Sequence, residues 1–259
     1  MAHRNAATPE EMRALIAGRR TDDPVWFTYG DTTVGYETIV GILGHHVTER
    51  RKREIEDVLD SRTLNVAVVV DGMVDLGNVS AIMRSAEAFG VQVVHAIDTS
   101  DAFKRSRRTT RGADKWIDRY RWEDASGCFD HLSEAGYSIL AADTTPQATP
   151  IGDVDLTSRV AVVFGNERRG ISQQAARLVD GTIRIPMEGF VASLNVSAAA
   201  SIVLHEVHRQ RIERYGRNGD LTPGDRARIR AVWFLKSVRE SEAIVQRALD
   251  DGYPVRSVT

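Results

Sequence analysis

The chain has 259 residues, of which 42% are hydrophobic and 27% charged, and its formal net charge is −2 at pH 7. This length suits one large domain, or one domain with appendages, around an ordinary hydrophobic core. The lone Cys128 excludes an internal disulfide, and no apolar run approaches the roughly 18 residues that a membrane span needs. Because Glu10 and Glu11 precede any apolar segment, a secretory signal is not expected, and we predict a cytoplasmic protein.

The first 47 residues carry no clear period and are expected to form a partly ordered N-terminal extension. From Thr48 to about Ser61, apolar residues at helical spacing predict a helix that turns Ile55, Val58 and Leu59 inward. We assign this helix to a central domain that spans residues 48–215.

Inside the central domain, short apolar runs alternate with amphipathic segments. Strands are expected at 66–70, 91–97, 138–142, 160–164 and 182–185, and helices at 79–89, 124–135, 172–179 and 195–215. The first of these strands is apolar throughout, as parallel strands buried on both faces are, and the alternation of strands with helices predicts an α/β fold with a parallel sheet. After a break at Gly216–Gly219, the Thr222-Pro223 pair begins a helical C-terminal extension, residues 216–259.

Three strand-to-helix junctions carry clusters of polar residues. The first is Asp75–Ser80 with Arg84 four residues later, the second is Phe164–Ser172, and the third is Ile185–Ala198. Since α/β folds bind ligands at the carboxyl ends of their strands, the three junctions predict one shared site.

Each junction taken alone also has a structural explanation. Asn78 and Asn195 suit the capping of a helix, Arg84 suits a solvated helix face, and the glycines of the second junction suit a tight turn. A phosphate-binding loop is excluded, because Ile171 stands where that motif requires lysine. His205 and His208 lack the spacing of a helical zinc motif, and no dinucleotide-binding glycine motif follows the first strand, so we expect no metal and no Rossmann enzyme.

Arginine-rich clusters flank the three junctions and predict contacts with nucleic acid, although any one of them also suits a solvated surface. The candidates for RNA binding are Arg50, Arg51, Arg53, Arg107, Arg108 and Arg111. Arginine outnumbers lysine in these clusters, and its planar fork suits phosphate.

Together the three junctions resemble the three motifs of the SpoU (TrmH) family of RNA ribose 2′-O-methyltransferases, in the SPOUT superfamily. The motifs occur in the family's order, over roughly residues 48–215. The resemblance implies a parallel α/β sheet with a C-terminal trefoil knot of the SPOUT type, formed near residues 160–200, with helical extensions at both ends. It also implies S-adenosylmethionine as cofactor and a homodimer. Gly77 is a departure, because tRNA-modifying members can carry histidine there.

The resemblance also implies roles for individual residues. The catalytic group would comprise Arg84, Asn78, Glu167, Ser193 and Asn195, and the cofactor would be held by Ala142, Gly165, Ile185, Met187 and Leu194. A ribose hydroxyl is a poor nucleophile and needs its proton removed or its developing charge stabilised. The resemblance gives that task to Arg84, yet a guanidinium stays protonated, so base and oxyanion stabiliser both remain open.

For the substrate, the arginine-rich helix before the first strand and the helical C-terminal extension resemble the branch that methylates guanosine 18 of tRNA. Ribosomal-RNA members, including those that give thiostrepton-type resistance, usually carry a larger N-terminal domain than 47 residues allow. We therefore predict a tRNA methyltransferase. The alternatives are a ribosomal-RNA methyltransferase and a non-catalytic RNA-binding protein.

Overall fold

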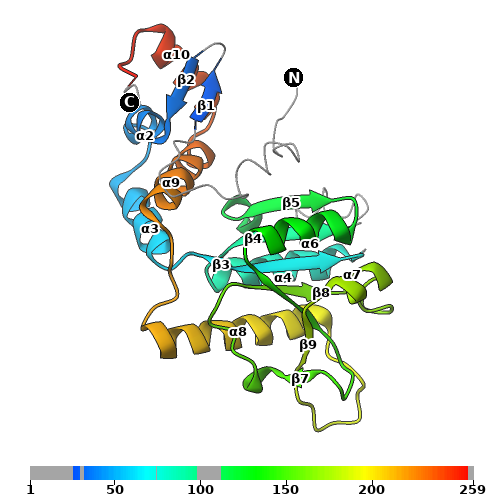
Figure 1. Ribbon diagram of the computed structural model, residues 1–259. Helices are drawn as coiled ribbons and strands as arrows, with labels where there is room; N and C mark the ends of the chain where they lie inside the picture. The colour runs from blue at the N-terminus through cyan, green and yellow to red at the C-terminus, as the bar shows by residue number, and fades with distance from the viewer. Residues whose placement is uncertain (1–25, 30–31, 74, 98–111, 256–259) are drawn as a thin grey trace. The chain divides into compact units, whose positions relative to one another are not determined.

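The computed structural model describes residues 26–29, 32–73, 75–97 and 112–255, which divide into two units (Figure 1). Among these residues, one unit runs from Thr63 to Asn218, and the other combines the chain up to Arg62 with the chain from Gly219 onward. The division differs from the expected one, because the segment 49–60 belongs to the second unit and not to the unit with the sheet.

The unit from Thr63 to Asn218 is built on one parallel sheet. Its strands are β3 (Thr63–Asp71), β4 (Val91–Ile97), β5 (Asp118–Trp122), β6 (Ser138–Ala142), β7 (Thr149–Pro150), β8 (Val160–Phe164) and β9 (Gly181–Arg184). Their order is β5-β4-β3-β8-β6-β9-β7, and every neighbouring pair is parallel. The predicted parallel α/β sheet is therefore confirmed, while the two edge strands β5 and β7 were not predicted.

Helices cover both faces of this sheet (Figure 1). On one face lie α4 (Leu76–Ala88) and α8 (Val196–Tyr215), and on the other lie α6 (Ala125–Glu134) and α7 (Gln173–Leu178). Two short 3-10 helices, η2 (Ala113–Lys115) and η3 (Ile151–Asp153), occupy connections. Side chains of β3 alternate between the two cores, with Val68 and Val70 on the α4 side and Ala67 and Val69 on the α6 side.

Helix α4 begins earlier than its apolar pattern predicts, and this brings the first junction into the helix. The carboxylate of Asp75 caps the helix by accepting a hydrogen bond from the backbone N–H of Asn78 at 2.8 Å. Asn78 therefore lies in the first turn. Ser80 is buried, with 3% of its surface exposed, and so does not share the exposed face of Arg84.

Among the described residues, the second unit has a hairpin and four helices. Strands β1 (Trp26–Tyr29) and β2 (Thr32–Gly35) pair antiparallel, and the helices are α2 (Tyr36–Gly44), α3 (Glu49–Asp60), α9 (Pro223–Ser237) and α10 (Ser241–Asp250). Helix α9 packs on the other three helices. The N-terminal extension is thus not only helical, and Val58, expected inward, is 41% exposed.

The two chain segments of this unit meet closely at the end of α3. A side chain at Gly219 would place its Cβ 1.9 Å from the carbonyl oxygen of Asp60, so only glycine fits there. The next residue, Asp220, donates its backbone N–H to the carbonyl of Arg62 at 3.0 Å. The guanidinium of Arg62 lies 5.1 Å from the ring centre of the buried Trp233.

Candidate functional site

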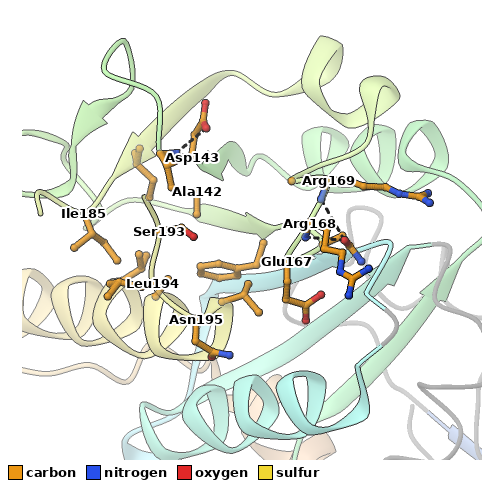
Figure 2. A pocket seen from close by; sticks show the side chains of 18 of the residues that line it. Ala142, Asp143, Glu167, Arg168, Arg169, Ile185, Ser193, Leu194 and Asn195 are labelled. Atoms are coloured by element: carbon orange, nitrogen blue, oxygen red, sulfur yellow. Dashed lines mark hydrogen bonds between the residues drawn. The ribbon is translucent and has the colours of Figure 1, made fainter. Parts of the chain in front are cut away.

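A cavity of about 590 Å³ opens where β6, β8 and β9 end (Figure 2). Its inner wall is apolar and includes Phe164, Ile183 and Val203, while its mouth carries carboxylate, amide and guanidinium groups. The carboxyl ends of parallel strands form this cavity, as the spacing of the second and third junctions predicts.

The residues expected to bind the cofactor come together in this cavity. Its lining includes Ala142 at the end of β6, Gly165 after β8, and Ile185, Met187 and Leu194 after β9. Glu167, Ser193 and Asn195, expected to be catalytic, line it too.

The loop after β8 is held in one conformation by backbone contacts. A Cβ on Gly165 would lie 2.2 Å from the backbone of Gly170, so the loop closes only over glycine. Asn166 exchanges two backbone hydrogen bonds of 2.8 Å with Gly170, which has a positive φ of 68°. The backbone of this loop therefore requires glycine at positions 165 and 170, whether or not a ligand binds.

Three amide and carboxylate side chains connect the three junctions at the cavity mouth. Asn78 donates its Nδ2–H to Glu167 Oε1 at 2.7 Å, and Asn195 donates its Nδ2–H to Asn78 Oδ1 at 3.0 Å. The Oδ1 of Asn195 accepts from the backbone N–H groups of Ser197 and Ala198, which caps α8. We call Glu167, Asn78 and Asn195 the amide relay.

Arg84 does not line this cavity within one copy of the chain. It is exposed on α4 and lines a separate depression together with Ser85 and Trp116. Within one copy of the chain, Arg84 is therefore separated from the other residues that the resemblance places in the catalytic group.

The arginines proposed to bind RNA are only partly described. Arg50 and Arg51 lie on α3 and form ion pairs with Glu54 at 3.5 and 2.9 Å, and Arg53 is exposed on the same helix. Arg107, Arg108 and Arg111 lie outside the residues that the structure describes.

Sequence reasoning missed several polar residues of the cavity. Asp143, Thr144, Arg168 and Arg169 line it as well. The position of Asp143 directly after a predicted strand was a usable signal, because that strand ends at the same sheet edge. The arginines were visible in the second junction, but nothing in their spacing indicated that they face a cavity.

Two buried side chains are unsuited to chemistry. Burial raises the pKa of the Cys128 thiol well above its ordinary value, so the thiolate form is suppressed, as expected for a structural cysteine. Burial, together with the neighbouring His131, lowers the pKa of His95 to about 3, and its Nδ1 accepts a hydrogen bond from Trp122 Nε1 at 2.9 Å. Both belong to the core on the α6 side.

The described residues contain no cluster of side chains suited to a metal ion and no helix long and apolar enough to cross a membrane. The cavity combines an apolar interior with polar groups at one end. Such a site suits an elongated organic ligand whose reactive end is held among hydrogen-bonding groups.

Comparison with known proteins identifies relatives of this arrangement. The chain is 38% identical over 166 residues to the tRNA (guanosine(18)-2′-O)-methyltransferase of Thermus thermophilus, covering 64% of this chain and 86% of that protein. Its identity to the Escherichia coli protein of the same name is 34% over 161 residues, covering 62% of this chain and 70% of that protein.

Solved structures give the same result. The crystal structure of the Aquifex aeolicus TrmH/SpoU tRNA modifying enzyme matches with a TM-score of 0.65 and 28% identity, covering 74% of this chain and 98% of that one. The SpoU methyltransferase AviRb from Streptomyces viridochromogenes, solved in complex with the cofactor AdoMet, matches with a TM-score of 0.52 and 29% identity, covering 56% and 57% of the two chains. Residues 65–205 match the SpoU rRNA Methylase family. The predicted resemblance is thereby confirmed: the chain belongs to the SpoU family of RNA methylases.

Proposed function

We propose that this protein transfers a methyl group from S-adenosylmethionine to the ribose 2′-hydroxyl of guanosine 18 in tRNA. The names of its relatives support the reaction and the substrate. The observation that carries the proposal is the amide relay, because it joins all three sequence motifs at the mouth of one cavity.

The cavity fits the proposed cofactor in size and in chemistry. Its volume of about 590 Å³ lies within the range of sites for drug-sized ligands. Ile185 and Leu194 offer apolar contacts, while the irregular segment from Met187 to Asn195 leaves backbone groups outside strand and helix pairing. When bound, S-adenosylmethionine supplies an activated methyl group.

The chain's own residues would orient the ribose and stabilise charge. In this proposal the Glu167 carboxylate and the Asn78 amide hold each other at 2.7 Å, and Asn195 fixes Asn78 from α8. Such a fixed set of groups aligns a hydroxyl for in-line attack with little loss of entropy at the reacting centre. The hydroxyl of Ser193, on the same cavity wall, completes the polar end.

A homodimer would supply the remaining catalytic group. Since Arg84 does not line its own cavity, the partner copy is the source that we propose for it. There it stabilises the negative charge that develops on the ribose oxygen. Helix α8 leaves Ile202 and Ile212 about two-fifths exposed, which supports its burial against a second copy.

We also propose that the connections around β9 form the trefoil knot of the SPOUT fold. Strand β9 lies between β6 and β7, so the connection between those two strands must cross the path of β9. Asp143 in that connection donates its backbone N–H to Ile183, and Arg184 donates its Nε–H to Ala148. Passage of the segment after Arg184 through this connection would complete the knot. A cytoplasmic location follows from the tRNA substrate and is part of the same proposal.

Bulk tRNA and ribosomal RNA from a strain that lacks the gene test the proposed reaction. Each RNA is incubated with the enzyme and methyl-labelled donor, digested, and mapped by nucleotide. We expect label on a ribose in tRNA, at guanosine 18. Label confined to ribosomal RNA would keep the reaction and overturn the tRNA substrate. Label on neither RNA, with donor binding intact by calorimetry, would favour the non-catalytic RNA-binding alternative.

A further inference from the structure

The cavity proposed for S-adenosylmethionine is called the donor cavity here. The loop from Asn166 to Gly170 separates it from a second cavity of about 1070 Å³. The second cavity lies at the carboxyl ends of β3 and β4, where Asp71 and Ile97 line it. All five loop residues line both cavities, and Arg168 and Arg169 are the cations among them. The two guanidinium groups therefore belong to the partition between the cavities.

Side-chain and backbone contacts fix this partition from within. Asn166 Oδ1 accepts the backbone N–H of Arg168 at 2.9 Å and that of Arg169 at 3.2 Å, and Asn166 Nδ2 donates to the carbonyl of Gly72 at 3.2 Å. At the far end, Ser172 donates its backbone N–H to the buried Asp71 carboxylate at 2.6 Å. The backbone of both arginines is thus anchored to the end of β3, and their side chains start from fixed points.

Within the described residues, neither Arg168 nor Arg169 has an anionic partner, and both are exposed. Other arginines of the chain are already engaged, for example Arg209 with Glu206 and Arg226 with Glu56. In Figure 2 the two side chains extend away from Ile185 and Leu194, on the side of the cavity where Glu167 lies. A pair of exposed, unneutralised guanidinium groups on a rigid loop is suited to bind an anion.

The walls of the second cavity restrict where that anion can lie. Asp71, Asp75, Glu123 and Asp124 line its interior. These carboxylates repel a phosphate, so the favourable position for negative charge is the partition at Arg168 and Arg169. RNA-binding proteins commonly set the register of their substrate through such backbone contacts.

We infer that Arg168 and Arg169 bind the RNA phosphates adjacent to the methylated nucleotide and thereby place its ribose at the amide relay. This inference rests on the proposed function, and it assigns to the two arginines a positioning role and not a catalytic one. Both side chains extend away from Ile185 and Leu194, the apolar contacts proposed for the cofactor, so we expect cofactor affinity to depend little on these arginines.

The test is the salt dependence of tRNA binding by the full-length protein. Arg168→Gln, Arg169→Gln and the double variant are compared with the wild type by titration at several salt concentrations. Each lost phosphate contact on a single strand lowers the slope of log K against log salt by about 0.7, so the double variant should lose about 1.4. We expect KM for tRNA to rise about tenfold per arginine, with the calorimetric affinity for S-adenosylmethionine unchanged.

Arg177→Gln is the matched control, because it removes the same charge from an exposed position on α7 that lines neither cavity. Arg168→Lys and Arg169→Lys keep the charge and should keep the slope. A double variant whose slope equals that of the wild type overturns the inference. So does a double variant that loses cofactor affinity as well, since the loop would then act on the donor cavity.

The two hypotheses fail in different ways. A wild type that binds tRNA with a steep salt dependence but transfers no methyl group overturns the proposed function, while the slope comparison still decides the role of the arginines. A wild type that binds no RNA overturns both.

Discussion

At the scale of single residues, Asn78 is the centre of the site because it both donates and accepts within the relay. Its amide is oriented by its partners: the Nδ2 faces a carboxylate and the Oδ1 faces the Nδ2 of Asn195. A carboxylate cannot replace this amide, because it has no hydrogen to donate to Glu167.

Asn78→Asp should therefore lower kcat by about 10- to 100-fold, the cost of losing a hydrogen bond to a charged group. The fold should persist, because a carboxylate in the first turn of α4 is favourable toward the helix dipole. Steady-state kinetics with tRNA, and calorimetry with the cofactor, separate the two effects. The double variant with Glu167→Gln restores a donor opposite the new carboxylate. Recovery in the double variant shows that relay geometry matters, and an unaltered kcat in the single variant contradicts the relay.

The sequence predicted which residues gather at the site better than it predicted their contacts. The family resemblance named Gly165, Ile185 and Leu194, and they gather because all follow strands that end at one sheet edge. The hydrogen bond from Asn78 to Glu167 spans 89 positions of the chain, and no local pattern encodes a contact of that range. The position of Arg84 could not be predicted for the same reason, because a helical wheel gives its face but not the cavity that it lines.

At the scale of helices and strands, α3 and α9 are joined by charge pairs. Glu56 on α3 accepts from Arg230 Nε at 2.5 Å and from Arg226 at 2.9 Å, and Arg226 also pairs with Asp60. The hydrogen bond from Arg230 is the largest cause that lowers the pKa of Glu56, although partial burial opposes it. The arginines of α9 are therefore structural partners of α3.

Glu56→Gln should lower the free energy of unfolding by about 1 kcal/mol at pH 7, since a partly exposed network is worth little more. The carboxylate of Glu56 binds a proton more readily in the unfolded chain than in the folded one. The contribution is therefore complete above the unfolded pKa of about 4.3 and is lost as the pH falls through the lower folded value.

Denaturant unfolding of the variant and the wild type at pH 7 and pH 3, monitored by tryptophan fluorescence, measures the difference in their free energies of unfolding. Glu240→Gln is the control, because that carboxylate lies 3.8 Å from Arg239 and both side chains are largely exposed. A Glu56→Gln variant that is equally destabilised at both pH values would show that packing, and not charge, joins the helices.

Elements with a strong local period were predicted closely, and edge elements were not. The bounds of β4, β6 and β8 agree with the predicted strands, because most residues of these inner strands are apolar. In strand β5 the arginines Arg119 and Arg121 alternate with the aromatic residues Tyr120 and Trp122, so in the sequence it resembles a basic surface segment. The hairpin β1–β2 is short, and its pairing is not visible in composition.

At the scale of the whole molecule, segments on both sides of the sheet in sequence belong to one unit. Among the described residues, those before Thr63 and those after Asn218 fold together, so these parts of the two apparent extensions form one unit. Sequence patterns are local and could not show that Gly219 lies against Asp60. The same limit applies to assembly, because a surface completed by a second copy looks like an ordinary exposed face in one chain.

The proposed dimer can be tested through Arg84. If each active site combines Arg84 of one copy with the amide relay of the other, then Arg84→Ala and Glu167→Ala are separately inactive but complement each other. Random reassociation makes about half of the dimers mixed, and each mixed dimer holds one intact site and one doubly defective site. Mixing after reversible dissociation should therefore restore about a quarter of the wild-type rate. Sites built from a single chain would leave every site in the mixture defective, and the mixture would stay inactive. Light scattering on the same samples must show dimers, because a monomer with full activity would place Arg84 at its own cavity after all.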